Sequence, residues 1–441
     1  MNLDKSYTTS GKGAIISLRK MITRSVSRLC GLAAVLLIFV HSPAVHAQQR
    51  ISDLESTVIL ISIDGFRADY FEKHQPPFIT ELLRRGVRAR WMTPVFPTKT
   101  FTNHYTLVTG LYPDNHGMIE NNMYDPGIGA VFGISKKEQV TDPRWWGGEP
   151  IWRTAQRQGQ ISASFFWPGS EAPIGGMLPN FFKEYEHTTP HEVRVDTVLG
   201  WLDLPRGQRP RMITTYFSDV DDAGHAYGPD DQRTRQAVLK VDSSIRRLFE
   251  GLRARGIEKM VSVILVSDHG MSPYRVGDSI VLDTMFDPND AERVFWVGEF
   301  TQIFPKPGRA DAIFDAIRSK LPPTATIYRN GEFPPRFKFG KNKRIAPIVV
   351  VPNEGSVITT KSRAESARRD GRFDNIRGAH GYDNGLESMR AIFVGHGGRF
   401  KRGVVTSPVS AIDVYELMCN ILKVKPAKND GSLKRIRHVL R

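Results

Sequence analysis

Apolar runs alternate along this chain with segments in which apolar residues recur at helical spacing. Continuous, β-branched runs are typical of strands buried on both faces of a parallel sheet. The strand candidates are 57–63, 161–167, 211–217 and 261–266, and the helix candidates are 76–86, 149–159 and 229–256. Strands that alternate with helices in this way predict an α/β fold with a mostly parallel central sheet flanked by helices.

The pattern changes in the last third of the chain. From about 286 to 369, short alternating strands, a helix near 310–321 and a basic, proline-rich stretch predict a smaller inserted α+β subdomain. A last strand is expected at 391–394, and the basic stretch 423–441 is expected to be a solvated extension. The main domain of this prediction spans 48–441.

The first 47 residues have the layout of a secretory signal peptide. Basic residues precede an apolar run from Cys30 to Val40, and small residues before Gln48 offer a cleavage site. The run is too short for a permanent transmembrane helix, so we expect no stable membrane span after cleavage. An uncleaved anchor is the alternative, and Met21 is an alternative start. Cleavage would leave Cys419 as the only cysteine and so no intramolecular disulfide, which fits an exported, periplasmic or secreted protein, most simply of the bacterial periplasm.

The charge balance points to anionic partners. The 441 residues carry a formal charge of +15, and 1–47 hold six basic residues and one acidic residue, so a cleaved chain would carry +10. Such a surface favours anionic substrates without identifying them. We expect small-molecule substrates and no specific nucleic-acid partner, and the sequence indicates no particular oligomeric state.

Three predicted strands end in an acidic residue. These are Asp64, then Asp221 with His225, then Asp268 with His269. Sites in open α/β sheets form at the carboxyl ends of strands, so these residues should converge, and His380 in a glycine-bracketed loop is a further candidate. A lone Asp-His pair is more often a capped turn, but the repetition favours a metal site. Asp and His are zinc ligands, and two metals about 4 Å apart can clamp both oxygens of an in-line phosphoryl displacement.

The segment 95–105 offers a hydroxyl group. Thr100 is expected in the first turn of a short helix, where free N–H groups and the helix dipole favour anions. From this segment alone, Thr98 or Thr100 as an N-cap is the simpler interpretation. Threonine needs a base or a metal to become a nucleophile, and the acid-ended strands would supply the metal.

Together these motifs resemble the nucleotide pyrophosphatase/phosphodiesterase family of the alkaline phosphatase superfamily. The matching stretches follow the family's order through nearly all of the chain after the signal. They are 63–67, 97–101, 109–117, 121–126, 149–152, 166–170, 221–225, 267–271 and 380–384. The resemblance implies an alkaline-phosphatase-like fold.

The resemblance also assigns ligands. It implies two Zn²⁺ per chain and makes Thr100 the nucleophile, which forms a phospho-threonine intermediate. One zinc ion would be held by Asp64, Thr100, Asp268 and His269, and the other by Asp221, His225 and His380. Because Asp/His sites accept several divalent ions, the choice of zinc rests on the resemblance.

Substrate contacts follow from the same resemblance. Asn121 matches the side chain that hydrogen-bonds the phosphoryl oxygen, Phe101 and Tyr185 fall where the family stacks a nucleobase, and Trp152 lies near the same pocket by motif. Two positions depart from the family: Thr102 replaces a proline, and Asp219-Val220 replaces an acidic residue and a proline.

The predicted reaction is hydrolysis of nucleotide phosphodiester and pyrophosphate bonds with release of nucleoside 5′-monophosphates. The alternative is the same chemistry on a phospholipid or another phosphodiester. A monoesterase is disfavoured because no motif supplies extra positive charge, and a sulfatase because Thr100 stands where those enzymes have a modified cysteine. A non-catalytic envelope-binding module would need a broken site, yet every expected ligand type is present.

Overall fold

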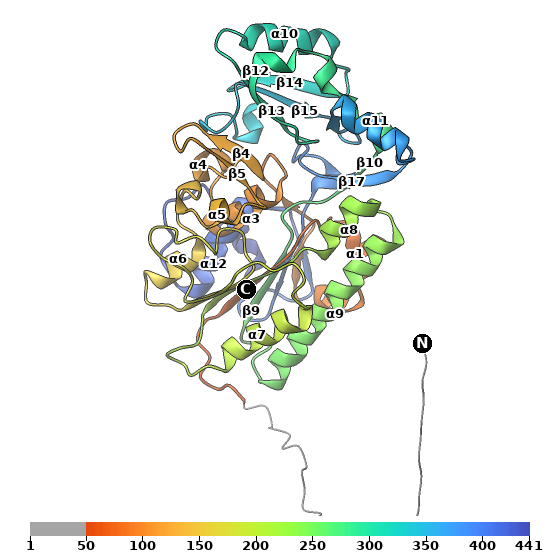
Figure 1. Cartoon of the computed structure of the whole chain (residues 1–441). Helices are drawn as coiled ribbons and strands as arrows, with labels where there is room; N and C mark the ends of the chain where they lie inside the picture. Colours follow the sequence, from red (N-terminus) through yellow and green to blue (C-terminus); the bar gives the residue numbers. More distant parts are fainter. Residues whose placement is uncertain (1–49) are drawn as a thin grey trace, which may run out of the picture. The chain divides into compact units, whose positions relative to one another are not determined.

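The computed structural model describes residues 50–441, which form one compact unit (Figure 1). The predicted signal peptide, with Met21 and Cys30, lies outside the described residues. Among residues 50–441, no helix combines the length and the apolar character needed to cross a bilayer.

An eight-stranded sheet lies at the centre, in the order β19-β2-β18-β9-β1-β8-β6-β7. Its strands are β1 (Val58–Ile63), β2 (Val87–Ala89), β6 (Ser162–Phe165), β7 (Phe181–Lys183), β8 (Met212–Phe217), β9 (Ser262–Val266), β18 (Phe393–His396) and β19 (Val404–Thr406). Every neighbouring pair is parallel except the two formed by β18, which runs antiparallel to β9 and β2. The predicted mostly parallel sheet is confirmed.

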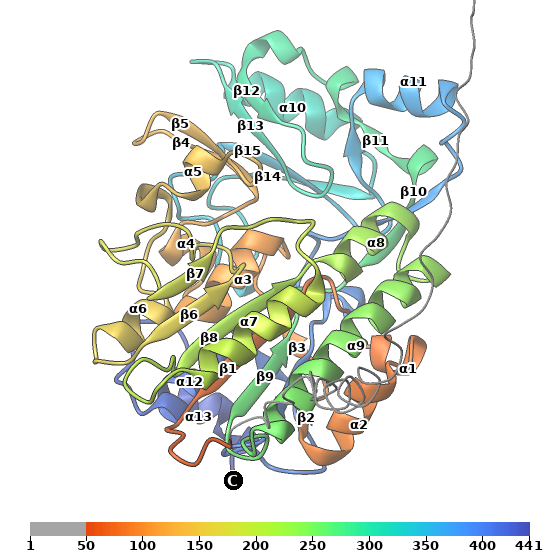
Figure 2. The same ribbon diagram turned by 60° about the horizontal axis from the view of Figure 1, so that its bottom comes forward.

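Helices cover both faces of this sheet, which explains why β1 is apolar throughout. Val58 and Leu60 pack into one core, while Ile59, Ile61 and Ile63 pack into the other. The first core contains side chains of α3 (Thr100–Thr109), α6 (Ile151–Gln156) and α12 (Val414–Leu422), and the second those of α2 (Pro77–Arg85), α7 (His191–Asp203) and α9 (Gln232–Ala254). Figure 2 shows α7 and α9 in front of the sheet.

The segment after β8 forms a helix where the sequence predicted a strand-end loop. Helix α8 spans Asp219–Tyr227 and has three acidic residues in its first turn, a position that the helix dipole favours. Asp221 and His225 are four residues apart, so they lie on the same face of α8.

Residues 112–148 contain several short regular elements. They hold α4 (Pro113–His116), β4 (Asn122–Asp125), β5 (Ala130–Gly133) and α5 (Lys137–Val140). Strands β4 and β5 pair as an antiparallel hairpin.

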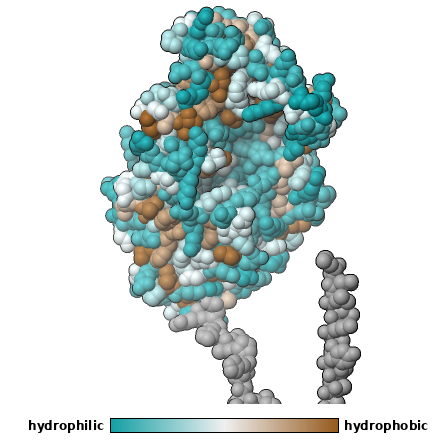
Figure 3. Space-filling model, in the orientation of Figure 1, coloured by the Kyte–Doolittle hydropathy of each residue, from teal (hydrophilic) through white to brown (hydrophobic). Residues whose placement is uncertain are grey.

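A separate four-stranded antiparallel sheet follows in the chain, in the order β12-β13-β15-β14, and lies at the top of Figure 1. Its elements are β12 (Ala291–Phe295), β13 (Thr301–Pro305), β14 (Ala325–Arg329), β15 (Ile348–Pro352) and helix α10 (Ala310–Lys320). They share a hydrophobic core of their own around Ile303, Phe314 and Val350. We propose that they form the inserted subdomain expected at 286–369. Figure 3 shows a largely hydrophilic face that is hollowed below this sheet.

The prediction of a solvated C-terminal extension at 423–441 is wrong. This stretch contains helix α13 (Leu433–Ile436), and the side chains of Ile436 and Val439 are fully buried in the main core. Leu440 pairs with Phe400 through a β-bridge. The basic residues between these apolar positions hid their spacing in the sequence.

Replacing Ile436 with alanine is expected to lower the free energy of unfolding by about 2–5 kcal/mol, because it leaves a cavity in a packed core. Urea denaturation measures the change. Lys434→Ala, on the same helix but exposed, is the matched control and should stay within about 0.5 kcal/mol of the parent. Equal stability of both variants would contradict the packed C-terminus.

Candidate active site

Three neighbouring strands deliver the acidic residues to one place. β1 lies between β8 and β9 and is parallel to both, so their carboxyl ends share one edge of the sheet. Asp64 comes directly after β1, Asp268 lies two residues after the end of β9, and Asp221 lies in the first turn of α8. Gly65 makes this meeting possible: its φ is +66°, and a Cβ there would lie 2.9 Å from Asp221 Oδ1.

Two of the acidic side chains leave an oxygen atom without a hydrogen bond. Asp64 Oδ2 accepts a hydrogen bond from the Tyr216 hydroxyl at 2.6 Å, and Asp268 Oδ1 accepts one from the Gly65 amide at 3.2 Å. Asp268 Oδ2 lies 2.9 Å from His269 Nε2, whereas Asp64 Oδ1 and Asp221 Oδ1 are buried without a hydrogen bond within the described residues. Buried carboxylate oxygens of this kind are costly unless a cation neutralises them.

Three histidines have a defined tautomer. Their Nδ1 atoms lie within hydrogen-bond distance of backbone carbonyl oxygens: His225 of Gly378 at 2.9 Å, His380 of Thr98 at 2.8 Å, and His269 of Gly270 at 2.9 Å. Because a carbonyl only accepts, each Nδ1 carries a proton, which leaves the Nε2 atom of each ring as the possible metal ligand. The Nε2 atoms of His225 and His380 are 3.0 Å apart. Two facing lone pairs repel one another unless a cation lies between them.

Burial and neighbouring charges shift the pKa values of Asp64 and His380. Burial, and then the charges of Asp268 and Asp221, raise the pKa of Asp64 well above its usual value. Burial, and then His269 and His225, hold the pKa of His380 well below the usual range, so it stays neutral and able to bind a metal. A divalent cation would relieve the repulsion among the carboxylates.

The residues therefore fit metal ions. Two groups have ligand atoms within 4.8 Å of one another, namely Asp221 with His225 and His380, and Asp64 with Asp221 and His269. These are five of the seven residues that the resemblance assigned to metal binding. Of the other two, Asp268 has its Oδ2 atom 2.9 Å from His269 Nε2, and the Thr100 hydroxyl lies 3.4 Å from the same nitrogen.

His104 lies beside this cluster and was not predicted. It forms a third close group with Asp64 and Asp268, and all three are buried. However, its Nε2 is 2.7 Å from the Ser62 hydroxyl and its Nδ1 is 2.8 Å from the carbonyl oxygen of Thr100. Since both ring nitrogens are engaged by the protein, His104 holds α3 against β1 rather than binding a metal. Its position one turn after Thr100 was the available signal.

Thr100 is the first residue of α3, and Lys99 is the N-cap, so the N-cap interpretation of Thr98 and Thr100 is wrong. The Thr100 hydroxyl lies 3.4 Å from His269 Nε2. Thr98 has another role: its hydroxyl donates to the carbonyl oxygen of Tyr382 and accepts from the amide of Gly381. The segment before α3 thereby holds the loop of His380.

A cavity of about 450 Å³ opens beside Thr100. Asp64 and Asp221 contribute to its wall, together with the aromatic side chains of Phe101, Phe166 and Tyr185. Tyr185 is 45 % exposed, and its ring centroid lies 5.2 Å from that of Phe166. The cavity thus joins the candidate metal ligands Asp64 and Asp221 to a wall of aromatic side chains.

Comparison with known proteins identifies the family of this chain. The family described as type I phosphodiesterase / nucleotide pyrophosphatase matches residues 58–383. The chain belongs to this family. It is 37% identical over 398 residues to a venom phosphodiesterase of Crotalus durissus collilineatus, covering 88% of this chain and 47% of that protein. It is 36% identical over 394 residues to ectonucleotide pyrophosphatase/phosphodiesterase family member 3 of Rattus norvegicus, covering 87% and 44%. The chain thus spans about half the length of these relatives.

A solved structure of this family confirms the predicted fold. Murine ectonucleotide pyrophosphatase/phosphodiesterase 5, an inactive threonine-to-alanine variant in complex with AMP, superposes with a TM-score of 0.82 at 32% identity. The match covers 88% of this chain and 100% of that one. The human counterpart gives a TM-score of 0.82 at 31% identity, covering 87% of this chain and 100% of that one.

Among the substrate contacts that family resemblance suggested, Trp152 does not line this cavity. It lies in α6, is fully buried in the main core, and its indole Nε1 has no hydrogen-bond partner within the described residues. Phe166, which sequence reasoning did not single out, does line it. Its φ of +66° is rare for a bulky residue, a strain that is typical of functional sites. The family stretch 166–170 was the available signal.

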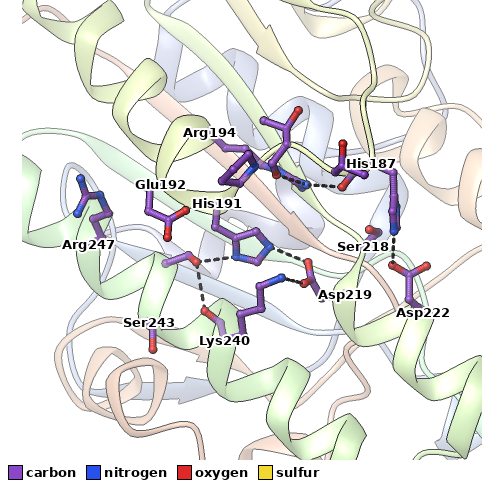
Figure 4. A pocket seen from close by; sticks show the side chains of 14 residues that line it. His187, His191, Glu192, Arg194, Ser218, Asp219, Asp222, Lys240, Ser243 and Arg247 are labelled. Atoms are coloured by element: carbon purple, nitrogen blue, oxygen red, sulfur yellow. Dashed lines mark hydrogen bonds and ion pairs between the residues drawn. The ribbon is translucent and has the colours of Figure 1, made fainter. Parts of the chain in front are cut away.

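Asp219, where the sequence departs from the family, lines a second cavity, which is drawn in Figure 4. Asp219 begins α8, and its carboxylate bonds to His191 Nε2 at 2.7 Å and to Lys240 Nζ at 2.5 Å. His191 Nδ1 lies 2.7 Å from the Ser244 hydroxyl. These bonds tie the helix of Asp221 to α7 and α9. The other departure, Thr102, is fully buried in the first turn of α3.

Proposed function

We propose that this chain hydrolyses phosphodiester and pyrophosphate bonds of nucleotides and releases nucleoside 5′-monophosphates. One observation carries the proposal: the hydroxyl of Thr100 lies at the junction of a metal-binding cluster and a cavity with aromatic walls. The cluster suits a phosphate and the aromatic walls suit a nucleobase. The AMP bound by murine ectonucleotide pyrophosphatase/phosphodiesterase 5 is a nucleoside 5′-monophosphate, which supports the assignment.

In this proposal two Zn²⁺ ions are held by the predicted ligands. Asp64, Thr100, Asp268 and His269 would hold one ion, and Asp221, His225 and His380 the other. When bound, these ions supply Lewis acidity that neutralises phosphate charge and lowers the pKa of a ligating hydroxyl. The chain's contribution is orientation, because the carbonyl groups of Gly378, Thr98 and Gly270 aim the three Nε2 atoms inward.

The reaction proceeds in two displacements. Thr100 Oγ gives its proton to solvent and bonds to phosphorus, while the bond from phosphorus to the leaving oxygen breaks and the leaving group departs with that electron pair. Water then attacks the phospho-threonine and gives up one proton, the bond from phosphorus to Thr100 Oγ breaks, and Thr100 Oγ takes up a proton from solvent. Water's oxygen remains on the nucleoside 5′-monophosphate. Phe101 and Tyr185 hold the nucleobase throughout, which keeps phosphorus in line with Thr100.

In this proposal Asn121 donates a hydrogen bond to a phosphoryl oxygen. Its Oδ1 accepts a hydrogen bond from the Phe101 amide at 3.0 Å, so its Nδ2 group remains free to donate near the start of α3. Side-chain donors of this kind stabilise the charge that develops in the transition state.

Replacing Asn121 with alanine is expected to lower kcat by about 10²- to 10³-fold through loss of this donor. Hydrolysis of the nitrophenyl ester of thymidine 5′-monophosphate measures it. Asn122→Ala is the matched control, because Asn122 points its side chain toward Gly133 in the hairpin. A turnover of Asn121→Ala equal to that of Asn122→Ala would remove Asn121 from the site.

A substrate panel tests the function itself. The nitrophenyl ester of thymidine 5′-monophosphate should be cleaved with a kcat/KM at least about 100-fold above that of nitrophenyl phosphorylcholine, because only the former has a base for the aromatic cavity. ATP should yield AMP and pyrophosphate rather than ADP and phosphate. Preference for the choline ester would favour a phospholipid-type substrate instead, and ADP as product would reject the proposal.

We further propose that the chain is exported after removal of residues 1–47. The relatives include venom enzymes and ectoenzymes, and residues 50–441 contain no helix suited to span a membrane. N-terminal sequencing of the exported protein tests this, with Gln48 as the expected first residue and Met1 or Met21 as the contrary result.

A further inference from the structure

A further cavity of about 560 Å³ adjoins the same metal cluster through a different ligand. Thr100 lines the aromatic cavity, whereas His225 lines this one. The side chain of His225 is 42% exposed, although its Nδ1 is held by the carbonyl oxygen of Gly378. The cavity therefore reaches the metal cluster at the group formed by Asp221, His225 and His380.

Basic side chains outnumber acidic ones in the lining of this cavity. Arg363, Arg372 and Arg377 contribute three guanidinium groups, against the single carboxylate of Glu299. Glu299 is already neutralised, because its Oε2 accepts a bond from Lys99 Nζ at 2.5 Å. An excess of positive charge thus faces the cavity.

These arginines come from the chain segment that leads to His380. Arg377 lies on β17 (Ile376–Ala379), which pairs antiparallel with β10 (Ser272–Arg275), and it stands directly opposite Tyr274, another lining residue. The side chain of Arg377 has no ion pair among those found within residues 50–441, and the next residue carries the carbonyl that orients His225. Arg377 thus lines the same cavity as His225 and can pair with an anion there.

The other two arginines each use only some of their hydrogen-bond donors. Arg363, on helix α11 (Lys361–Arg369), uses one nitrogen to donate to the carbonyl oxygen of Trp296 at 3.3 Å. Arg372 Nη2 is bound to Asp370 at 2.6 Å. A guanidinium group has five donors, so each can still form a bidentate contact with phosphate oxygens.

We propose that this cavity binds the leaving group and selects substrates whose leaving group carries phosphate, such as the pyrophosphate of a nucleoside triphosphate or the second half of a dinucleoside polyphosphate. The inference rests on the proposed function, which seats the nucleobase between Phe101 and Tyr185. In-line displacement puts the leaving oxygen opposite the nucleophile, so a nucleotide seated there extends its leaving group away from Thr100. Guanidinium groups match phosphate and repel a choline-type cation.

Binding measured without turnover tests the proposal. In the Thr100→Ala protein, ATP contains the leaving group and AMP does not, so the ratio of their Kd values reports on this cavity alone. Arg363→Ala/Arg372→Ala/Arg377→Ala is expected to reduce the preference for ATP over AMP at least tenfold. Arg369→Ala is the matched control: it removes an exposed arginine of α11 that does not line the cavity, and it should leave the ratio unchanged.

Kinetics in the chain with Thr100 intact give a second readout. The triple variant should lower kcat/KM for ATP at least tenfold relative to kcat/KM for the nitrophenyl ester of thymidine 5′-monophosphate, and raise the inhibition constant of pyrophosphate. If kcat/KM of the triple variant falls more for diadenosine tetraphosphate than for ATP, the cavity is assigned to a nucleotide leaving group. If it falls less, the cavity is assigned to pyrophosphate.

Failure of the inference is distinct from failure of the proposed function. One outcome is a triple variant that still cleaves the nitrophenyl ester while its Kd ratio and its kcat/KM ratio both stay within twofold of those of the parent protein. That result would overturn the leaving-group cavity and leave the proposed nucleotide phosphodiesterase function intact. A parent protein that cleaves neither the nitrophenyl ester nor ATP would reject the function and the inference together.

Discussion

Thr100→Ala is expected to lower kcat for the nitrophenyl ester of thymidine 5′-monophosphate by about 10⁴-fold or more, with the fold and the bound metals retained. The change removes the one atom that bonds to phosphorus, and loss of a nucleophile costs on this scale in hydrolases that use a covalent intermediate. The fold should tolerate it, since Thr100 begins α3 and alanine is a good helix former.

Two variants make this result specific. Thr100→Ser keeps a hydroxyl and should retain far more activity than the alanine variant. Thr102→Ala changes a buried threonine of the same helix whose hydroxyl has no hydrogen-bond partner within the described residues, and it should stay within a few fold of the parent. Mass spectrometry after rapid quench should find a phosphoryl group on the peptide that contains Thr100. Thr100→Ala turnover near the parent rate would exclude this residue as the nucleophile.

Removal of metal by a chelator is expected to abolish at least 99% of the activity and to lower Tm by several degrees. Without cations, the Oδ1 atoms of Asp64 and Asp221 stay buried without a hydrogen bond, and two Nε2 atoms face each other at 3.0 Å. An ion present at 1,000 times its Kd stabilises the folded state by about 4 kcal/mol per site, and chelation removes that contribution. Metal analysis, activity assays and calorimetry on the same samples measure the effect.

The Thr100→Ala protein separates stability from turnover in this experiment. Asp64, Asp268 and His269 remain in it, so it should contain nearly two Zn²⁺ per chain and show nearly the same chelator-induced fall in Tm. Restoration of activity by Zn²⁺ but not by Mg²⁺ would support zinc, because Mg²⁺ prefers oxygen ligands. Fewer than about one metal ion per chain, or activity insensitive to chelator, would overturn the two-metal proposal.

The convergence of the acidic residues was predictable because it depends on chain connectivity. β1, β8 and β9 are apolar runs that only a doubly covered sheet can bury, and parallel strands bring their carboxyl ends to one edge. Asp64 and Asp268 follow directly from that rule. Asp221 and His225 required the extra fact that α8 is a helix, and their spacing of four residues was visible but unused.

Side-chain surroundings were harder to predict, because they depend on how elements dock. Trp152 belongs to a motif near the pocket, yet α6 packs against the sheet and buries its indole ring in the core. Ile436 and Val439 lie among basic residues, and only the position of α13 reveals that they are covered. In both cases the local pattern is compatible with exposure and with burial.

The sequence by itself determined the α/β class and the order of the strands that end in acids, because periodicity and residue chemistry are local properties. The proposed metal ligands came from the family resemblance. The tertiary structure alone decided the rest. It sets the tautomers of His225 and His380 through carbonyl groups distant in sequence, excludes His104 as a ligand, and gathers three arginines at the cavity that His225 lines. These features depend on contacts between segments that only folding brings together, which is why no local pattern contains them.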